Sequence, residues 1–553
     1  MHKGFLVITK ELLDFFNDNS EISKGRIIFF TVLTGVSYNL ILVVINHASE
    51  IAYIGDVKDT GTIRYFFMFI TLCALYILAY TNSIINMLMM AEEVIQNVRV
   101  KLISKIQHTE LYHLEEIGTS KIDTQIAKDT ELISQGFRYL MATFNSGVMA
   151  IGTLFYVLVI SPSAFLIILL LSTVGVIVYK QNYTQNLEKL KLSRKTEAEF
   201  FHSLNDVISG FKELKVNYQK NQDIFTDATK IAKLTQELRI SAENSLAWNQ
   251  AVVLIFYFLI VAVTLFILPS YGLITSWDIS SIITLLIFIY QPIITFLRSV
   301  PNIMLISVAI KNLNQLESKL DTQDVANSGI MLYDVPTNFE KIVLNSVRFQ
   351  YKDKDGSVLF AAGPINLTIQ QGETIFVVGG NGSGKSTILK LLTGLYYPLE
   401  GGSIALDDEI LDKTNYQAYR ELFSIIYTDF HLFEKLYGLK SINEQEITQL
   451  LRKMEIYKKT QFINGKFTNL DLSTGQKKRI AYIVAMLDNK QICIFDEWAA
   501  DQDPRFRRFF YEHLIKELKD MGKTVIAVTH DDKWFDKADR ILKMEEGKLV
   551  KYS

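Results

Sequence analysis

The sequence predicts a membrane domain of six α-helices followed by an α/β domain that binds a nucleotide through a P-loop. Three observations lead to this fold class. Six long apolar stretches lie in the first 310 residues, a P-loop pattern lies in the second half, and a charged connector separates them. A chain of 553 residues is also too long for one ordinary domain. We therefore place a transmembrane domain at 1–310, a connector at 311–339 and a nucleotide-binding domain at 340–553.

The composition narrows the class of protein. Hydrophobic residues make up 49% of the chain, which favours a membrane protein, and the formal charge of −2 gives no basic field for nucleic acid. Cys73 and Cys493 both lie in apolar runs, so neither is expected to form a disulfide or bind a metal. The first residues lack an apolar core followed by a cleavage site, so we expect no cleaved signal.

The apolar stretches predict six membrane-spanning helices. Most of them approach or exceed the roughly 20 residues that a spanning helix needs, whereas a large soluble helical core would not give so many uninterrupted runs. They lie at residues 25–45, 65–90, 137–160, 164–179, 247–268 and 279–310. The lipid bilayer is therefore an expected partner.

The loops between these spans indicate the topology. Lys and Arg are concentrated before the first span and in the second and fourth loops, so both termini and these loops are expected in the cytoplasm. The two loops are long, polar and helix-like, and their helices would extend about 30 Å beyond the membrane. We expect them to turn near residues 113–119 and 210–218. Their tips either press on the nucleotide-binding domain, which we favour, or form solvated hairpins.

Polar residues within the spans are candidates for a substrate path, because polar side chains are costly in lipid. For any single amide, a hydrogen bond between helices is the commoner explanation. The candidates are Asn46, His47, Asn82, Asn86, Asn145, Asn249, Gln250, Gln291, Arg298 and Asn302.

The P-loop pattern G-x-x-x-x-G-K-[ST] follows a short β-branched run and precedes a helix-like segment. Its glycines allow successive backbone N–H groups and a helix N-terminus to face a phosphate, which a ligand-free glycine turn would not require. Lys385 would reach the β- and γ-phosphates, and the Ser386 hydroxyl would bind Mg²⁺. The residues assigned to the nucleotide are Gly379, Gly380, Asn381, Gly382, Ser383, Gly384, Lys385, Ser386 and Thr387.

Two further features point to nucleotide hydrolysis. An apolar strand at residues 491–495 ends in Asp496 and Glu497, where the first carboxylate can hold Mg²⁺ and the second can act as general base. Tyr351, about 28 residues before the P-loop, could stack on an adenine ring, although an aromatic residue in a strand usually belongs to the core.

The motifs around this strand resemble those of ATP-binding-cassette (ABC) proteins. The run from Leu472 to Gln476, Leu-Ser-Thr-Gly-Gln, is similar to the family's signature motif. Asp503 occupies the position of its D-loop aspartate, and His530 that of its switch histidine. With six spans and long cytoplasmic hairpins, essentially the whole chain resembles a half-size ABC exporter of the type IV fold.

The resemblance implies the roles of several residues. ATP and Mg²⁺ would be the cofactors. Glu497 would be the catalytic base, and Lys385 and His530 would contact the γ-phosphate. Ser473 and Gly475, with Gln476 and Asp503 in the same motifs, would serve the ATP held by another subunit. A homodimer with two composite sites is therefore implied, although a heterodimer remains open.

The sequence also departs from the family pattern. Thr474 replaces the second signature glycine, and the glutamine expected before His431 is absent, so that Thr428 or Asp429 stands in its place. We assign Asp429 to the metal, with Thr428 as the other candidate for this position. The stretch from Thr428 to Ser473 is short for the family, which predicts a reduced helical subdomain.

Residues 496–507 and the Thr-Asp-Phe-His-Leu-Phe loop are similar to those of bacterial exporters of cyclic peptides, microcins and siderophore precursors. This similarity favours export of a small peptide-like product across the bacterial cytoplasmic membrane. The alternatives are a lipid or lipopeptide flippase, an importer on the same fold, and a membrane-tethered regulatory ATPase.

Overall fold

The computed structural model describes residues 14–16, 19–20, 24–54, 61–320, 338–353, 355–412, 415–439 and 443–552. The chain divides into two compact units. The membrane unit comprises residues up to Gln107 and Thr119–Lys319, and the second unit, which we call the cassette, comprises His108–Gly118 and the chain from Leu320 onward. Most of the predicted connector, residues 321–337, lies outside the described residues, as do Lys3, Lys10 and residues 55–60 of the first loop.

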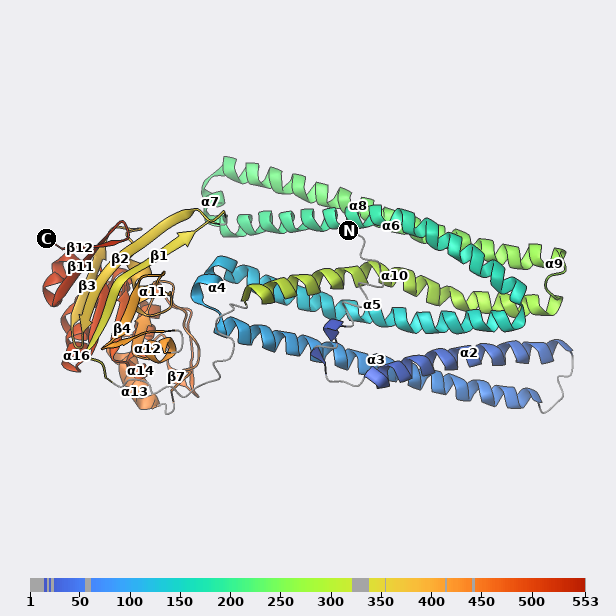
Figure 1. Ribbon diagram of the computed structural model, residues 1–553, viewed down its shortest axis with the longest axis horizontal. Coiled ribbons are helices and arrows are strands. Elements are labelled where there is room, and N and C mark those ends of the chain that lie inside the picture. Colours follow the sequence, from blue (N-terminus) through green and yellow to red (C-terminus); the bar gives the residue numbers. More distant parts are fainter. Residues whose placement is uncertain are drawn as a thin grey trace. The chain divides into compact units, whose positions relative to one another are not determined.

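Six helices of the membrane unit are long and apolar enough to cross a bilayer, which confirms the six predicted spans (Figure 1). Each runs well beyond its apolar stretch. The long helices are α2 (Lys24–Ile54), α3 (Gly61–His108), α5 (Thr119–Ile160), α6 (Pro162–Ser209), α8 (Tyr218–Ala262) and α10 (Ser276–Leu320). A π-helical turn, η1 (Val263–Ile267), and the short α9 (Leu268–Ser270) extend α8. Helices α6 and α8 pack along each other as a hairpin (Figure 1).

Two short helices lie where the sequence predicts the hairpins to turn. Helix α4 (Leu111–Ile117) follows α3 and ends at Gly118, whose positive φ of 86° suits a residue without a Cβ. Helix α7 (Phe211–Val216) joins α6 to α8. Asn217 then starts α8, because its side chain accepts a hydrogen bond from the Lys220 N–H.

The polar residues within the spans fall into two groups. The amides of Asn82, Asn86 and Asn302 donate to backbone carbonyls four residues earlier in their own helices, so the helix itself satisfies them. Asn46 and Asn249 are buried, and among the described residues their side-chain N–H₂ groups have no hydrogen-bond partner. Buried amides without partners are costly, and a role for these positions in a substrate path stays a prediction.

The cassette contains two main sheets. A four-stranded sheet has the order β2-β1-β4-β5, and a six-stranded sheet has the order β12-β11-β3-β10-β9-β6, in which all neighbours except β11 and β12 are parallel. The strands are β1 (Lys341–Lys352), β2 (Val358–Gln370), β3 (Thr374–Gly379), β4 (Ser403–Leu406), β5 (Glu409–Ile410), β6 (Phe423–Ile426), β9 (Ile492–Asp496), β10 (Thr524–Val528), β11 (Arg540–Glu545) and β12 (Lys548–Lys551).

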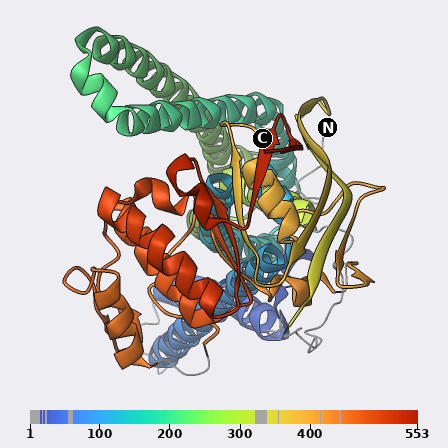
Figure 2. The ribbon, with the colours of Figure 1, turned by 90° about the vertical axis from the view of Figure 1, so that its left-hand side faces the viewer.

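Helices cover both faces of the six-stranded sheet, and the red ones group on one side of its strands in Figure 2. They are α11 (Lys385–Leu392), α12 (Tyr416–Arg420), α13 (Glu444–Lys453), α14 (Thr474–Asp488), α15 (Pro504–Phe509) and α16 (Ile515–Asp520), with η2 (Trp498–Asp501), η3 (Phe510–Leu514) and η4 (Asp532–Lys537) between them. Within the described part of residues 429–472, α13 and the hairpin β7 (Phe462–Ile463) and β8 (Lys466–Phe467) form the small subdomain.

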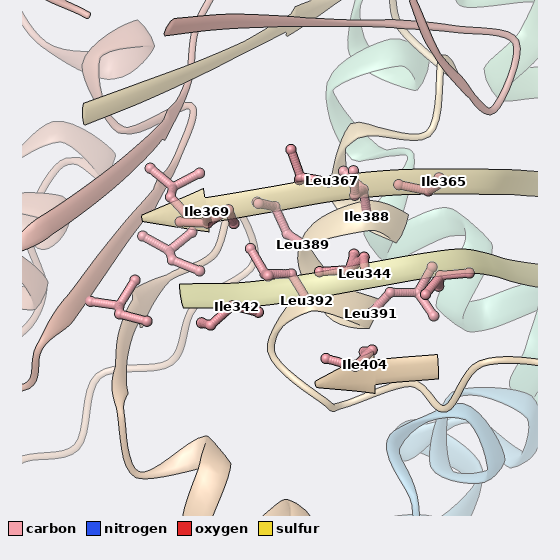
Figure 3. Close-up of a cluster of buried hydrophobic side chains, with 14 of the residues drawn as sticks. Ile342, Leu344, Ile365, Leu367, Ile369, Ile388, Leu389, Leu391, Leu392 and Ile404 are labelled. Carbon is pink, nitrogen blue, oxygen red and sulfur yellow. The ribbon is translucent and has the colours of Figure 1, made fainter. Parts of the chain in front are cut away.

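Alternate residues of the central strands enter two separate cores. Ile492 and Ile494 of β9 pack in the core that contains α11, whereas Cys493 and Phe495 pack in the core of α13 to α16. This alternation is expected of a strand whose two faces are both covered. Figure 3 shows the first core, where apolar side chains of α11 meet those of β1, β2 and β4. The α11 helix that begins at the P-loop is thus fixed between two sheets.

Candidate nucleotide site

The predicted site residues come together at the carboxyl ends of four parallel strands. The P-loop follows β3, Thr428 follows β6, Asp496 ends β9 and His530 follows β10. Because β10 lies between β3 and β9, with Val528 opposite Asp496, the strand order brings residues that are far apart in sequence to one edge. This edge of an open parallel sheet is where α/β proteins bind ligands.

The P-loop backbone depends on glycine at two positions. Gly379 has a φ of 153°, and a Cβ there would lie 2.4 Å from the Met544 carbonyl oxygen. Gly384 adopts a left-handed conformation (φ 99°) as the residue that caps α11. By contrast, a Cβ on Gly380 or Gly382 would meet no atom within 4 Å, so the outer side of the loop is open. This is the backbone geometry that a phosphate-binding loop requires.

The polar side chains of the loop are poised for an anion. The Lys385 Nζ donates to the carbonyl oxygens of Gly379 (2.9 Å) and Gly380 (3.0 Å), so the ammonium lies across the loop. The buried Ser383 hydroxyl has no hydrogen-bond partner among the described residues. An ammonium group and an unpaired hydroxyl beside open backbone fit a phosphate group.

Asp496 is the centre of a small hydroxyl network. The Thr428 hydroxyl donates to its Oδ2 at 2.8 Å, and the Ser386 hydroxyl does so at 3.4 Å. Burial raises the pKa of Asp496, the neighbouring charge of Glu497 adds to this rise, and the two hydroxyl donors oppose it. A nearly buried carboxylate flanked by hydroxyls is a donor set that suits Mg²⁺.

The structure separates the two candidates for the absent glutamine. Thr428 contacts Asp496, whereas Asp429 is exposed and forms no hydrogen bond or ion pair with the described residues. Its assignment to the metal therefore remains a prediction without a contact to support it. Among the described residues, no group of three or more His, Cys, Asp or Glu side chains is placed so that it could hold a metal ion. The groups that fit Mg²⁺ are thus Asp496 and the Ser386 hydroxyl, completed by phosphate oxygens, while the Thr428 hydroxyl orients Asp496.

Glu497 lies beside the two other groups expected at the γ-phosphate. Its Oε1 is 3.3 Å from the His530 Nε2 and 3.9 Å from the Lys385 Nζ. The carboxylate is about one-third exposed, so water can reach it. A carboxylate that is accessible to water and held next to a histidine can accept a proton from an attacking water molecule.

The residues assigned to another subunit's ATP lie at the start of α14. Ser473 caps this helix in a capping box with Gln476, in which each side chain accepts from the other residue's backbone N–H. A Cβ on Gly475 would lie 2.4 Å from the Asp501 carbonyl oxygen, so glycine is needed for close packing there. Asp503 caps α15 by accepting from the Phe506 N–H and pairs with Arg479 at 2.8 Å.

Tyr351 belongs to an aromatic cluster that includes α4. The Tyr112 ring contacts those of Phe349, Tyr351 and Tyr396, with centroids 5.6, 6.5 and 6.1 Å apart. The Tyr351 hydroxyl donates to Tyr396 (3.3 Å) and lies 3.4 Å from the Thr387 hydroxyl. The ring is half-buried and packs against the first core beside the helix that carries the P-loop serine, so its contact with an adenine ring stays a prediction.

Charged groups tie α4 to the rest of the cassette. The Lys390 Nζ of α11 pairs with Glu115 at 2.8 Å, and the Tyr396 hydroxyl donates to the same carboxylate. Burial, with the charges of Asp496, Asp429 and Glu115, raises the pKa of Tyr427 to about 12. Glu115 therefore lies within electrostatic reach of the residue that precedes Thr428.

Sequence reasoning missed several of these residues. Glu115 and Lys390 are charged residues on predicted helices, and such residues are usually solvated, so no local pattern marks them. Lys478 follows the signature-like segment and is fully buried, with its Nζ 2.6 Å from the Glu497 carbonyl oxygen. The signal that could have identified Lys478 as a buried lysine is the run of apolar residues that follows it closely on α14.

Comparisons with known proteins match both parts of the chain. Residues 25–296 match the family model described as the ABC transporter transmembrane region, and residues 362–500 match that described as ABC transporter. The ATP-binding protein SyrD of Pseudomonas syringae pv. syringae is 29% identical, with 94% of this chain and 93% of that protein covered. The ATP-dependent lipid A-core flippase of Pseudoalteromonas translucida is 25% identical, with 86% and 81% covered.

The fold is also similar to a solved structure. A bacterial Atm1-family ABC exporter with ATP bound superimposes with a TM-score of 0.73 at 18% identity, and the match covers 96% of this chain and 95% of that one. At this identity the likeness concerns the fold, which agrees with the predicted type IV exporter fold.

Proposed function

The chain belongs to the ABC transporter family, and we propose that it exports a peptide-like natural product such as a cyclic peptide, a microcin or a siderophore precursor. ATP hydrolysis in the cassette drives transport through the six membrane helices. The observation that supports this class of cargo is the segment 496–507, which resembles exporters of such products. The buried Trp498 of this segment makes it a fixed part of the hydrolytic site.

We propose a role in hydrolysis for each of these residues. Lys385 and the P-loop amides bind the β- and γ-phosphates. Glu497 accepts a proton from the attacking water molecule while the oxygen of that water forms a bond to the γ-phosphorus. The bond to the bridging oxygen breaks, and ADP and phosphate leave. His530, beside Glu497, orients the γ-phosphate. Bound Mg²⁺, held by Ser386 and Asp496 with Thr428 beside them, would neutralise charge on the phosphate oxygens.

The proposed assembly is a homodimer in the bacterial cytoplasmic membrane with both termini in the cytoplasm. Ser473 and Gly475 of one subunit would complete the ATP site of the other. This role is supported by the position of both residues at the start of α14, because a helix N-terminus favours an anion.

A second candidate is a lipid or lipopeptide flippase, which the similarity to a lipid A-core flippase favours. An anionic headgroup would call for basic side chains along the cavity, and within the sixth span the sequence offers Arg298. So few basic side chains within the spans disfavour this candidate.

The test of cargo uses purified protein in vesicles with a panel of cyclic peptides, siderophore precursors, microcins and lipids. We expect a peptide-like compound to stimulate ATP hydrolysis and to accumulate on the side opposite the cassette in an ATP-dependent manner. Stimulation and movement of lipids alone would assign the protein to the flippases, and accumulation on the cassette side would make it an importer.

Replacement of Glu497 by Gln should abolish steady-state hydrolysis, because the amide cannot accept the proton, while ATP binding is preserved. The Glu497→Gln protein should then accumulate as a closed cassette dimer with ATP. Turnover and nucleotide retention on the same preparation check this. Wild-type turnover in the variant would show that another group is the base.

A further inference from the structure

We infer that Lys478 of the signature helix α14 is a positioning residue for the catalytic base Glu497, an inference that rests on the role proposed for Glu497 above. The Lys478 side chain is 0% exposed. Its Nζ donates to the Glu497 carbonyl oxygen at 2.6 Å and pairs with the Asp501 Oδ2 at 2.7 Å. A buried ammonium persists only when it is paired, and both partners lie in the segment that carries the base.

A second bond between the same segments runs in the opposite direction. The Trp498 indole N–H donates to the Lys478 carbonyl oxygen at 2.8 Å. That indole is 1% exposed and stacks on Phe510 at a centroid distance of 4.6 Å. Lys478 therefore bonds to two successive residues of this segment, to the backbone of Glu497 and to the side chain of Trp498.

Glu497 needs such support because of its backbone conformation. Its φ of 51° and ψ of 35° lie in the left-handed region, which is unfavourable for a residue with a Cβ. Conformations of this kind persist at functional sites when surrounding contacts determine them. Besides Lys478, the backbone of Glu497 bonds to Val528 (3.2 Å) and Ala500 (3.3 Å).

The conformation matters because it aims the carboxylate. With this backbone, the Glu497 Oε1 lies 3.3 Å from the His530 Nε2 and 3.9 Å from the Lys385 Nζ. A change in the φ and ψ of Glu497 that reoriented its Cα–Cβ bond would move the carboxylate relative to both groups. Lys478 lies five residues after Ser473 in the chain, so the base is fixed by the helix whose start faces the ATP of the other subunit.

The experiment compares Lys478→Met with Lys478→Gln and with Lys523→Met as a matched control. Lys523 is another buried lysine that donates to a backbone carbonyl, that of Lys490, but it precedes β10 at the edge opposite the site. For Lys478→Met we expect kcat to fall about ten- to a hundredfold, because displaced catalytic groups lose about this much, with KM and ATP affinity within about twofold of wild type.

The other variants separate positioning from stability. The side-chain amide that Lys478→Gln introduces can still donate a hydrogen bond, so part of the lost kcat should return. Lys523→Met should lower the melting temperature without lowering kcat at temperatures where it is folded. If Lys478→Met folds poorly, the double variant Lys478→Met with Asp501→Asn removes the buried pair together, which is often tolerated. We expect it to be folded and still slow.

Three results would overturn the inference. They are a wild-type kcat in folded Lys478→Met or in the double variant, a rise in KM that accounts for the loss, or equal kcat losses in Lys478→Met and Lys523→Met. Glu497→Gln is measured in the same series. If that variant turns over ATP, the assigned base is wrong; if it is inactive while Lys478→Met is normal, only the role of Lys478 fails.

Discussion

At the scale of single residues, the nucleotide site departs from the family pattern at Thr428, the residue next to Asp496. Thr428 lies where the family pattern has glutamine, and its hydroxyl donates directly to Asp496 at 2.8 Å. A hydroxyl can orient a carboxylate that holds a metal, and such outer contacts influence metal affinity. Thr428 and the charged cap Asp503 are therefore the two side chains whose replacement is most informative.

Replacement of Thr428 by Val removes the donor to Asp496 but keeps the shape of the side chain. We expect the Mg²⁺ concentration for half-maximal hydrolysis to rise about ten- to a hundredfold, the usual range for loss of an outer-shell contact. Titration of ATPase activity with Mg²⁺, alongside binding of ATP without metal, checks this. Asp429→Ala is the matched control and should leave the titration unchanged; the reverse pattern would transfer the role to Asp429.

Asp503 should contribute stability that depends on pH. The backbone N–H of Phe506, followed by Arg479, lowers the pKa of this carboxyl below its usual range. Because the folded-state pKa lies below the unfolded value of about 3.9, the stabilisation is complete above that value and is lost as pH falls through the folded-state pKa.

The measurement is the melting temperature of wild type and Asp503→Ala from pH 7 to pH 3. Loss of the cap should cost about 1 kcal/mol near neutral pH, and the difference should shrink below about pH 4. Asp503→Asn keeps a capping group and should cost less. A difference that is constant with pH would show that the charge of Asp503 does not contribute.

Among the helices and strands, α4 is the element whose place in the fold differs most from its place in the sequence. It lies between two membrane helices in the sequence, yet its side chains pack in the cassette core through Leu111 and Tyr112. Glu115 meets Lys390 and Tyr396, which lie on or just after the P-loop helix. The predicted tip of the first long hairpin thus shares contacts with the groups around Tyr351.

Replacement of Glu115 by Gln should weaken coupling more than hydrolysis. The variant loses the charge that pairs with Lys390 but keeps its size, so ATP binding should persist while cargo moved per ATP falls about two- to thirtyfold. Transport and hydrolysis measured on the same vesicles check this. Glu116→Gln, at an exposed neighbour, is the control. Equal ratios in both variants and wild type would exclude this role for Glu115.

For the molecule as a whole, the proposed homodimer with two composite sites predicts complementation between variants. A Glu497→Gln chain and a Ser473→Arg chain should each be inactive alone. In a mixed dimer, one site combines both defects and the other combines neither, so hydrolysis should return to about half of the wild-type rate. Differently tagged chains, purified through both tags, provide the measurement. Absence of recovery in verified mixed dimers would contradict shared sites.

Much of this architecture could be predicted from the sequence because its signals are local. Six apolar stretches and a strand–loop–helix motif need no knowledge of distant contacts. The sequence could not decide between Thr428 and Asp429, because only the turn after β6 determines which side chain faces Asp496. Nor could it predict that α10 continues to Leu320, or that Lys478 meets a residue 19 positions later in the chain.

Because residues 108–118 belong to the cassette, the cassette cannot be exchanged between relatives as one continuous stretch of sequence. If relatives recombine or are fused by design, a crossover after the last membrane helix would separate Tyr112 and Glu115 from the surface they complete. A working chimera should exchange this eleven-residue insert together with the C-terminal half. The cassette is therefore encoded by two separate segments, and the short one lies within the part of the sequence that encodes the membrane helices.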